Sequence, residues 1–190
     1  MFIELTDHLR CPADHAESYL VLLPDETHER SVRAGRLGCP VCGRTYTLTD
    51  GVLDLGGGET TLLTPEAVTA LVGLSGPGGY MVLVGRPAAD WREVAQRNRG
   101  VGLVAVNPPR EVVDEPGISV LRSPGLPLKS RSMRGVVLGS PFGGDARWVS
   151  EAARVVLPGL RVAGEGPVPG SGTLELMAAT GGAWVATPRR

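Results

Sequence analysis

Short apolar runs separated by turn residues dominate the chain beyond residue 64. Continuous apolar runs bounded in this way are typical of strands buried on both faces, as in parallel sheets. The pattern predicts strands at 81–84, 101–106, 118–121, 136–138 and 160–163. A last pair of runs, 174–178 and 183–186, flanks Gly181-Gly182 and predicts a terminal antiparallel hairpin.

Helical spacing of apolar positions predicts three helices between these strands. The first begins at Thr64, which can cap it, with Pro65 at the first helical position. The segment 88–98 is long enough for a crossover helix, and Asp145 can cap a further helix that ends near Leu157. Strands that alternate with helices indicate a Rossmann-like, mostly parallel sheet, here of about seven strands with the hairpin antiparallel to the rest. Such sheets bind ligands at the carboxyl ends of their strands.

The first 55 residues have a different character, with short β-type runs and all the cysteines, and they end at Gly56-Gly57-Gly58. The triple glycine indicates a linker. We therefore expect a small β-rich unit at 1–55, a linker at 56–64 and an α/β domain at 65–190.

Composition adds limits on the class of protein. The 190 residues are 42% hydrophobic and 21% charged with a net charge of −1, which is typical of a globular protein and gives no indication of nucleic-acid binding. No apolar run approaches the roughly 20 residues of a membrane span, and the N-terminus lacks the features of a signal peptide. The expected location is the cytoplasm.

The cysteines indicate a metal site rather than a disulfide framework, because they are odd in number and two of them form the knuckle Cys39-Pro40-Val41-Cys42. Structural zinc sites take four thiolate or imidazole ligands. Cys11 supplies the third, and the fourth is either Asp14 or His15. His15 is favoured, because imidazole is commoner than carboxylate in closed zinc sites. The competing interpretation is that the cysteines bind no metal and His15 is an ordinary exposed side chain.

The segment from Leu9-Arg10-Cys11-Pro12 through Cys39-Pro40-Val41-Cys42-Gly43-Arg44-Thr45-Tyr46 to Asp50-Gly51-Val52 resembles the zinc ribbon of the methyltransferase-activator family. The resemblance covers about the first 55 residues and implies a zinc-binding module that contacts proteins. In that family the first knuckle has two cysteines, whereas this chain has Asp14-His15 after Cys11.

From about Pro65 onward the chain resembles class I S-adenosylmethionine-dependent methyltransferases, most clearly over Glu151-Ala152-Ala153-Arg154-Val155-Val156-Leu157-Pro158-Gly159-Leu160-Arg161-Val162. Leu126-Pro127-Leu128 and the terminal hairpin agree with this resemblance. It implies an S-adenosylmethionine site after the first and second strands, at Gly85 and Asn107. Only Gly85 remains of the glycine loop, which continues Arg86-Pro87-Ala88, and Asn107 stands where the family has an acidic residue for the ribose. These departures predict a degenerate cofactor site.

Few other residues are candidates for a functional role. Asp90 and Trp91 could line a pocket, or could serve as a helix cap and a packed side chain; Glu165 could act at the edge of the sheet, or could be a solvated loop carboxylate. No Ser/His/Asp set or phosphate-binding loop can be assembled.

Two hypotheses follow. In the first, a zinc-ribbon protein with a non-catalytic methyltransferase-like domain acts as a protein partner, scaffold or assembly subunit. The alternative is an active S-adenosylmethionine-dependent methyltransferase with an altered cofactor loop. Binding of S-adenosylmethionine discriminates between them.

Overall fold

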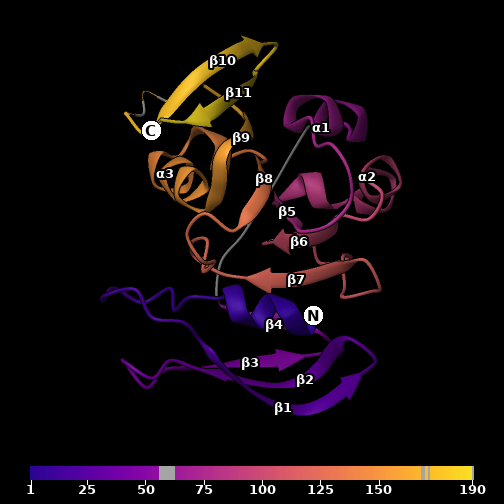
Figure 1. The fold of residues 1–190 in the computed structure, drawn as a ribbon, viewed down its shortest axis with the longest axis vertical. Coiled ribbons are helices and arrows are strands. Elements are labelled where there is room, and N and C mark those ends of the chain that lie inside the picture. The colour runs from indigo at the N-terminus through magenta and orange to yellow at the C-terminus, as the bar shows by residue number, and fades with distance from the viewer. Residues whose placement is uncertain (56–62, 168–169, 171, 190) are drawn as a thin grey trace.

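The structure is a computed structural model that describes residues 1–55, 63–167, 170 and 172–189. These residues form an α/β fold around one sheet, whose strands lie in the order β1-β2-β3-β4-β7-β6-β5-β8-β9-β11-β10 (Figure 1). Among them, no helix is both long and apolar enough to span a bilayer.

Helices and strands alternate from Pro65 onward, which is called here the second part of the chain. The strands are β1 (Val21–His28), β2 (Ser31–Gly38), β3 (Thr45–Thr49), β4 (Val52–Asp54), β5 (Tyr80–Val84), β6 (Gly102–Val106), β7 (Ile118–Arg122), β8 (Met133–Leu138), β9 (Val156–Glu165), β10 (Leu174–Thr180) and β11 (Ala183–Pro188). The α-helices are α1 (Pro65–Val72), α2 (Trp91–Arg97) and α3 (Ala146–Val155), and short 3-10 helices are η1 (Ile3–His8), η2 (Arg86–Ala88) and η3 (Phe142–Gly144).

The centre of the sheet is parallel, as the sequence predicted. Strands β7, β6, β5, β8 and β9 are parallel neighbours, which is consistent with a methyltransferase-like arrangement. The prediction for the hairpin needs one correction. Strand β11 is antiparallel to β9 and to β10, so β10 runs in the same direction as β9. Among the strands from β5 to β11, only β11 opposes the others.

Side chains of the parallel strands alternate between two buried layers, because successive residues of a strand point to opposite faces. On one face, Met81 and Leu83 belong to the same core as the buried residues of α1 and α2. On the other face, Val82 and Val84 join the core that contains η1 and α3. Figure 1 shows α1 and α2 on the side of the sheet opposite α3. Helices on both faces explain why these strands are apolar throughout.

Both predicted helix caps are confirmed. The side chain of Thr64 accepts a hydrogen bond from the backbone N–H of Ala67, and Asp145 accepts from two backbone N–H groups in the first turn of α3. Helix α3 ends at Val155, two residues earlier than predicted, because Val156 is already extended and begins β9. Strand β9 is accordingly longer than the predicted 160–163.

Residues 1–55, called here the N-terminal segment, extend the same sheet. Strands β1 to β4 pair antiparallel with one another, and β4 then pairs parallel with β7, with Leu53 opposite Leu121. Leu37, Leu48 and Leu53 are buried in the same core as the strands of the second part. The predicted triple-glycine linker lies outside the described residues.

Candidate metal centre

Three cysteines and one histidine meet at one end of the N-terminal segment. Cys39 follows β2 and Cys42 precedes β3, while Cys11 and His15 come from the loop after η1. The potential ligand atoms of Cys11, His15, Cys39 and Cys42 all lie within 4.8 Å of one another. The structure therefore brings together the four residues that the sequence analysis favoured, with His15 rather than Asp14 in the fourth place.

Backbone hydrogen bonds close the turn that brings the two knuckle thiols together. The N–H of Gly43 donates to the carbonyl of Cys39 at 3.0 Å, and the N–H of Cys39 donates to the carbonyl of Arg44 at 2.9 Å. Gly43 has a φ of +68°, a conformation that glycine adopts without strain. This is the physical reason why a Cys-x-x-Cys-Gly pattern places two thiols side by side.

The electrostatics of the site favour a thiolate at Cys39. Burial raises the pKa of this thiol, but the backbone N–H groups of Cys42 and Val41 and the neighbouring thiols outweigh burial and lower the pKa to about 6. Burial raises the pKa of the Tyr46 hydroxyl, as does its hydrogen bond with the thiol of Cys11. Tyr46 therefore stays protonated and lies 3.3 Å from the Cys11 sulfur, where its hydroxyl can donate to a thiolate.

His15 is oriented for ligation. Its Nδ1 donates to the carbonyl of Ala16 at 2.6 Å, and this bond also raises the pKa of the imidazole. With the proton held on Nδ1, the Nε2 lone pair faces the thiols and lies 3.5 Å from the sulfur of Cys39.

The donor set and its spacing fit zinc. Tetrahedral zinc with sulfur ligands at about 2.3 Å and nitrogen at about 2.0 Å requires sulfur–sulfur and sulfur–nitrogen separations of roughly 3.8 and 3.5 Å. Here the sulfurs of Cys11 and Cys42 are 3.7 Å apart, and Cys39 and His15 are separated by 3.5 Å. Three thiols and one imidazole are also a typical structural zinc set, with no position left for a reacting ligand.

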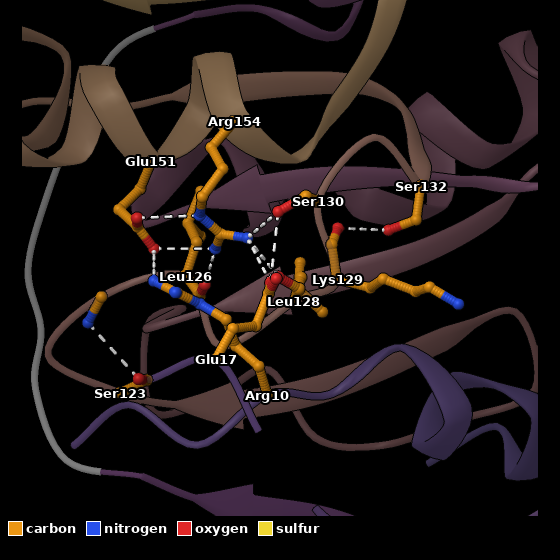
Figure 2. Close-up of polar contacts among 11 residues, drawn as sticks. Arg10, Glu17, Ser123, Leu126, Leu128, Lys129, Ser130, Ser132, Glu151 and Arg154 are labelled. Carbon is orange, nitrogen blue, oxygen red and sulfur yellow. Dashed lines mark hydrogen bonds and ion pairs between the residues drawn. The ribbon is translucent and has the colours of Figure 1, made fainter. Parts of the chain in front are cut away.

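Arg10, the residue before Cys11, connects the Cys/His cluster to α3. Arg10 donates to the carboxylate of Glu151 at 2.5 Å, and Arg154 donates to the same carboxylate twice, at 2.9 Å each (Figure 2). Arg154 also donates to the carbonyls of Leu126 and Leu128, both at 2.8 Å. Glu151 thus links the loop that carries Cys11 to helix α3, and Arg154 links α3 to the loop between β7 and β8.

The charges in this link are partly buried and matched. The side chains of Arg10 and Glu151 are only 24% and 19% exposed. Burial acts to raise the pKa of Glu151, but hydrogen bonds and charges of Arg154 and Arg10 outweigh it and hold the pKa below its usual range. The sequence analysis missed this network. The spacing of Glu151 and Arg154 along α3 was a signal for their own pairing, but no local pattern indicated Arg10.

The second candidate site lies at the carboxyl ends of β5 and β6, where the methyltransferase resemblance places Gly85 and Asn107. Gly85 has a φ of +73°, and a Cβ there would stand 2.9 Å from the ring of Phe142. A Cβ at Gly139 would stand 2.5 Å from the ring of Pro87. Phe142 and Pro87 are both buried, so the chain's own side chains pack against the two glycines at this edge.

Asn107 is engaged within the protein. Its Oδ1 accepts from the N–H of Ser123 at 2.8 Å, and its Nδ2 donates to the carbonyl of Ser123 at 2.6 Å. Only 2% of Asn107 is exposed. The amide therefore joins the ends of β6 and β7, and both of its polar atoms are engaged by the backbone of Ser123. The residues of this edge do not fit the contacts that the resemblance implies for S-adenosylmethionine.

The remaining candidates have structural explanations. Trp91 is buried among the side chains of α1 and the strands, so its role is packing. Asp90 makes no side-chain cap bond to α2. The interpretation of Glu165 as a solvated loop carboxylate was wrong: it ends β9, is 7% exposed and accepts from the N–H of Ser140 at 3.0 Å. The segment that follows β8 holds this side chain in place, because the N–H of Ser140 donates to its carboxylate.

No protein-family model matches the chain, and no curated protein matches it. Among solved structures, a geranyl diphosphate methyltransferase in complex with GPP and sinefungin is similar over 53% of this chain and 42% of that chain, at 17% identity and a TM-score of 0.42. The match thus spans less than half of that protein.

Proposed function

We propose that this chain is a cytoplasmic zinc-binding protein whose methyltransferase-like domain acts through a protein partner rather than by methyl transfer. In this proposal residues 1–55 are a zinc ribbon, 56–64 a linker and 65–190 the methyltransferase-like domain. The observation that carries it is the cluster of Cys11, His15, Cys39 and Cys42, with ligand atoms within 4.8 Å of one another.

Zinc would have a structural role here. Bound by four protein ligands, it would join the loop after η1 to the turn between β2 and β3. Structural zinc in small modules contributes on the order of 10 kcal/mol to folding. Strand β1 is almost wholly exposed, so a contribution of this size would add to the stability that the N-terminal segment gains from the core it shares with the rest of the sheet.

The non-catalytic part of the proposal is supported by the carboxyl edge of the sheet. Asn107 is occupied by the backbone of Ser123, and Phe142 packs against Gly85. A cofactor there would have to displace Phe142 and break two hydrogen bonds. Buried polar groups left without partners each cost about 1–3 kcal/mol, so the loss would offset much of the binding energy of a small ligand.

A role in protein contacts is supported by the surface of the N-terminal segment. Tyr19, Val21, Leu23 and Val41 are large apolar side chains that are between 40% and 62% exposed. Val21 and Leu23 alternate along β1 and so share one face of the strand, and Tyr19 lies two residues before it. Apolar side chains gathered on an exposed face are typical of interaction surfaces.

Elemental analysis of the purified 190-residue protein tests the proposed zinc site. We expect one zinc per chain, and we expect Cys39→Ser to lose the zinc together with the fold of the N-terminal segment. His15→Ala should weaken zinc binding, whereas the matched control Asp14→Ala should not. A metal-free protein with an intact N-terminal segment would refute the zinc proposal, and loss of zinc in Asp14→Ala alone would assign the fourth ligand to Asp14.

Calorimetric titration of the protein with S-adenosylmethionine tests the proposal that the methyltransferase-like domain is not catalytic. We expect no binding at physiological concentrations. A dissociation constant near or below ~10 μM, which corresponds to ~7 kcal/mol of binding, would overturn the proposal and favour the active methyltransferase.

A further inference from the structure

The three cysteines of the candidate metal centre differ in their access to water. Cys11 and Cys39 are only 5% and 3% exposed, whereas Cys42 is exposed. A cysteine that binds a metal does so as a thiolate, and burial of that negative charge costs free energy unless hydrogen-bond donors face the sulfur. Water can solvate the sulfur of Cys42, so Cys11 and Cys39 depend on donors from the protein.

The sulfur of Cys39 has several donors. The backbone N–H groups of Cys42 and Val41 donate to it. The hydroxyl of Ser18, a buried residue, lies 3.8 Å from the same sulfur. Because two of these three donors belong to the backbone of the Cys39-Cys42 turn, the turn itself stabilises a thiolate at Cys39.

The sulfur of Cys11 has fewer donors. The loop after Cys11 contains Asp14 and His15 and no second cysteine. Among the described residues, two groups lie within hydrogen-bond distance of the Cys11 sulfur: the Cys42 thiol at 3.7 Å and the Tyr46 hydroxyl at 3.3 Å. A metal-bound Cys42 has lost its proton and cannot donate. Tyr46 is then the remaining side chain of this set that can donate to Cys11.

Strand β3 fixes the position of Tyr46. The residue is the second of β3 and lies opposite Leu37 of β2 in the antiparallel pair. Its ring packs against the core that contains Leu37 and Leu48. Since the sheet and the core hold the ring, the hydroxyl is placed at the Cys11 sulfur before any metal binds. A phenylalanine at this position would keep the packing of the ring and lose only the donor.

We propose, on the basis of the proposed zinc site, that the Tyr46 hydroxyl donates a hydrogen bond to the Cys11 thiolate of the metal-bound protein and thereby sets the affinity of the site for zinc. Tyr46 is a positioning residue, because it acts on the metal through Cys11. Loss of a hydrogen-bond partner of a metal ligand typically lowers metal affinity about 10–100-fold. Loss of the Ser18 hydroxyl should have a smaller effect, because Cys39 keeps the N–H groups of its own turn.

Competition between the purified protein and a chromophoric zinc chelator measures the affinity. Tyr46→Phe should raise the dissociation constant for zinc about 10–100-fold, and Ser18→Ala should raise it less. The matched control is Tyr19→Phe, which removes the hydroxyl of a tyrosine that is 40% exposed in the same segment, and it should leave the dissociation constant unchanged. Circular dichroism shows whether each variant keeps the fold of the unaltered protein.

Cobalt(II) in place of zinc gives a readout that a loss of packing would not change. The thiolate-to-cobalt charge-transfer absorption depends on the electron density of the sulfur, and a hydrogen bond to the sulfur withdraws part of that density. At saturating cobalt, this band should therefore lie at longer wavelength in Tyr46→Phe than in the unaltered protein and in Tyr19→Phe.

The outcomes separate this inference from the proposed zinc site. Zinc binding that is unchanged in Tyr46→Phe would overturn the role of Tyr46 and leave the zinc site standing. Weaker binding with an unshifted cobalt band, or a larger effect of Ser18→Ala than of Tyr46→Phe, would overturn it as well. An unaltered protein that binds neither zinc nor cobalt would refute the zinc site and the role of Tyr46 together.

Discussion

Replacement of Glu151 by Gln tests how firmly the loop that carries Cys11 is held against α3. The Glu151 carboxylate accepts one hydrogen bond from Arg10 and two from Arg154. Hydrogen bonds to charged groups contribute about 1.5–3 kcal/mol each, against about 1 kcal/mol between neutral groups. The amide keeps one acceptor oxygen but turns an NH₂ group toward the guanidinium groups, so the variant loses at least one bond and weakens the others.

The expected loss of stability follows from the number of hydrogen bonds to Glu151 and from the exposure of the side chains that make them. Glu151 and Arg10 are 19% and 24% exposed, so water screens the interaction in part. Arg154 also keeps its bonds to the carbonyls of Leu126 and Leu128. We therefore expect Glu151→Gln to lower the free energy of unfolding by about 2 kcal/mol, between the value for surface pairs and that for fully buried ones.

Urea unfolding of the purified protein at neutral pH, followed by tryptophan fluorescence, measures this loss. Urea is preferred because a guanidinium salt would screen the ion pairs. The matched control is Glu93→Gln on α2, which removes an exposed pair with Arg97 at helical spacing. Its expected cost is below ~0.5 kcal/mol. Equal effects of the two substitutions would refute the view that Glu151 holds the N-terminal segment on α3.

The pH dependence provides a second check with a defined sign. Although burial raises the pKa of Glu151, Arg154 and Arg10 lower it below the ordinary value of 4.5. A carboxyl group with a lowered pKa stabilises the folded state above its unfolded pKa, and this stabilisation is lost as the pH falls through the folded pKa. The difference between the unaltered protein and Glu151→Gln should therefore shrink below pH 4.5. A difference that is constant from pH 7 to pH 3 would contradict the assignment.

Three other substitutions test individual packing and hydrogen-bond arguments by urea unfolding. Asn107→Asp should lower the free energy of unfolding by about 1–3 kcal/mol, because a carboxylate oxygen would replace the amide group that donates to the carbonyl of Ser123. An unchanged stability would mean that this hydrogen bond contributes nothing. Gly164→Ala should lower the free energy of unfolding by about 1–3 kcal/mol, because the added Cβ would stand 2.3 Å from the ring of the buried Trp184. An unchanged stability would show that the ring can move. Thr64→Ala should cost about 1 kcal/mol through loss of the α1 cap, and no loss would exclude a stabilising role for the cap.

The elements of the fold follow from local patterns in the sequence. Apolar runs such as 81–84 and 101–106 form strands because a strand covered on both faces needs apolar side chains at every position. Thr64 and Asp145 begin helices because their side chains satisfy backbone N–H groups within a few residues. The Cys39-Cys42 knuckle is local in the same sense, since two residues and a glycine are enough to close the turn. These features were predicted from the sequence because each depends on neighbours along the chain.

The arrangement of those elements depends on contacts between residues far apart along the chain. Arg10 pairs with Glu151 across 141 positions, and Leu53 of β4 lies beside Leu121 of β7. Periodicity and turn chemistry describe short segments and carry no information about which distant surfaces meet. The sequence therefore determined that Cys11, Cys39 and Cys42 could share a metal, but left Asp14 and His15 as alternatives.

The tertiary structure places His15, and not Asp14, in the cluster with the three cysteines, and it also determined the environment of the second candidate site. His15 lies beside the three cysteines because the loop after Cys11 folds so that its Nε2 faces the thiols. Asn107 looked available for a ribose in the sequence, but packing of β6 beside β7 brings it onto the backbone of Ser123. Residue types and spacing thus identified the chemical groups of this protein, whereas their availability to a ligand depended on burial and hydrogen bonding by distant parts of the chain.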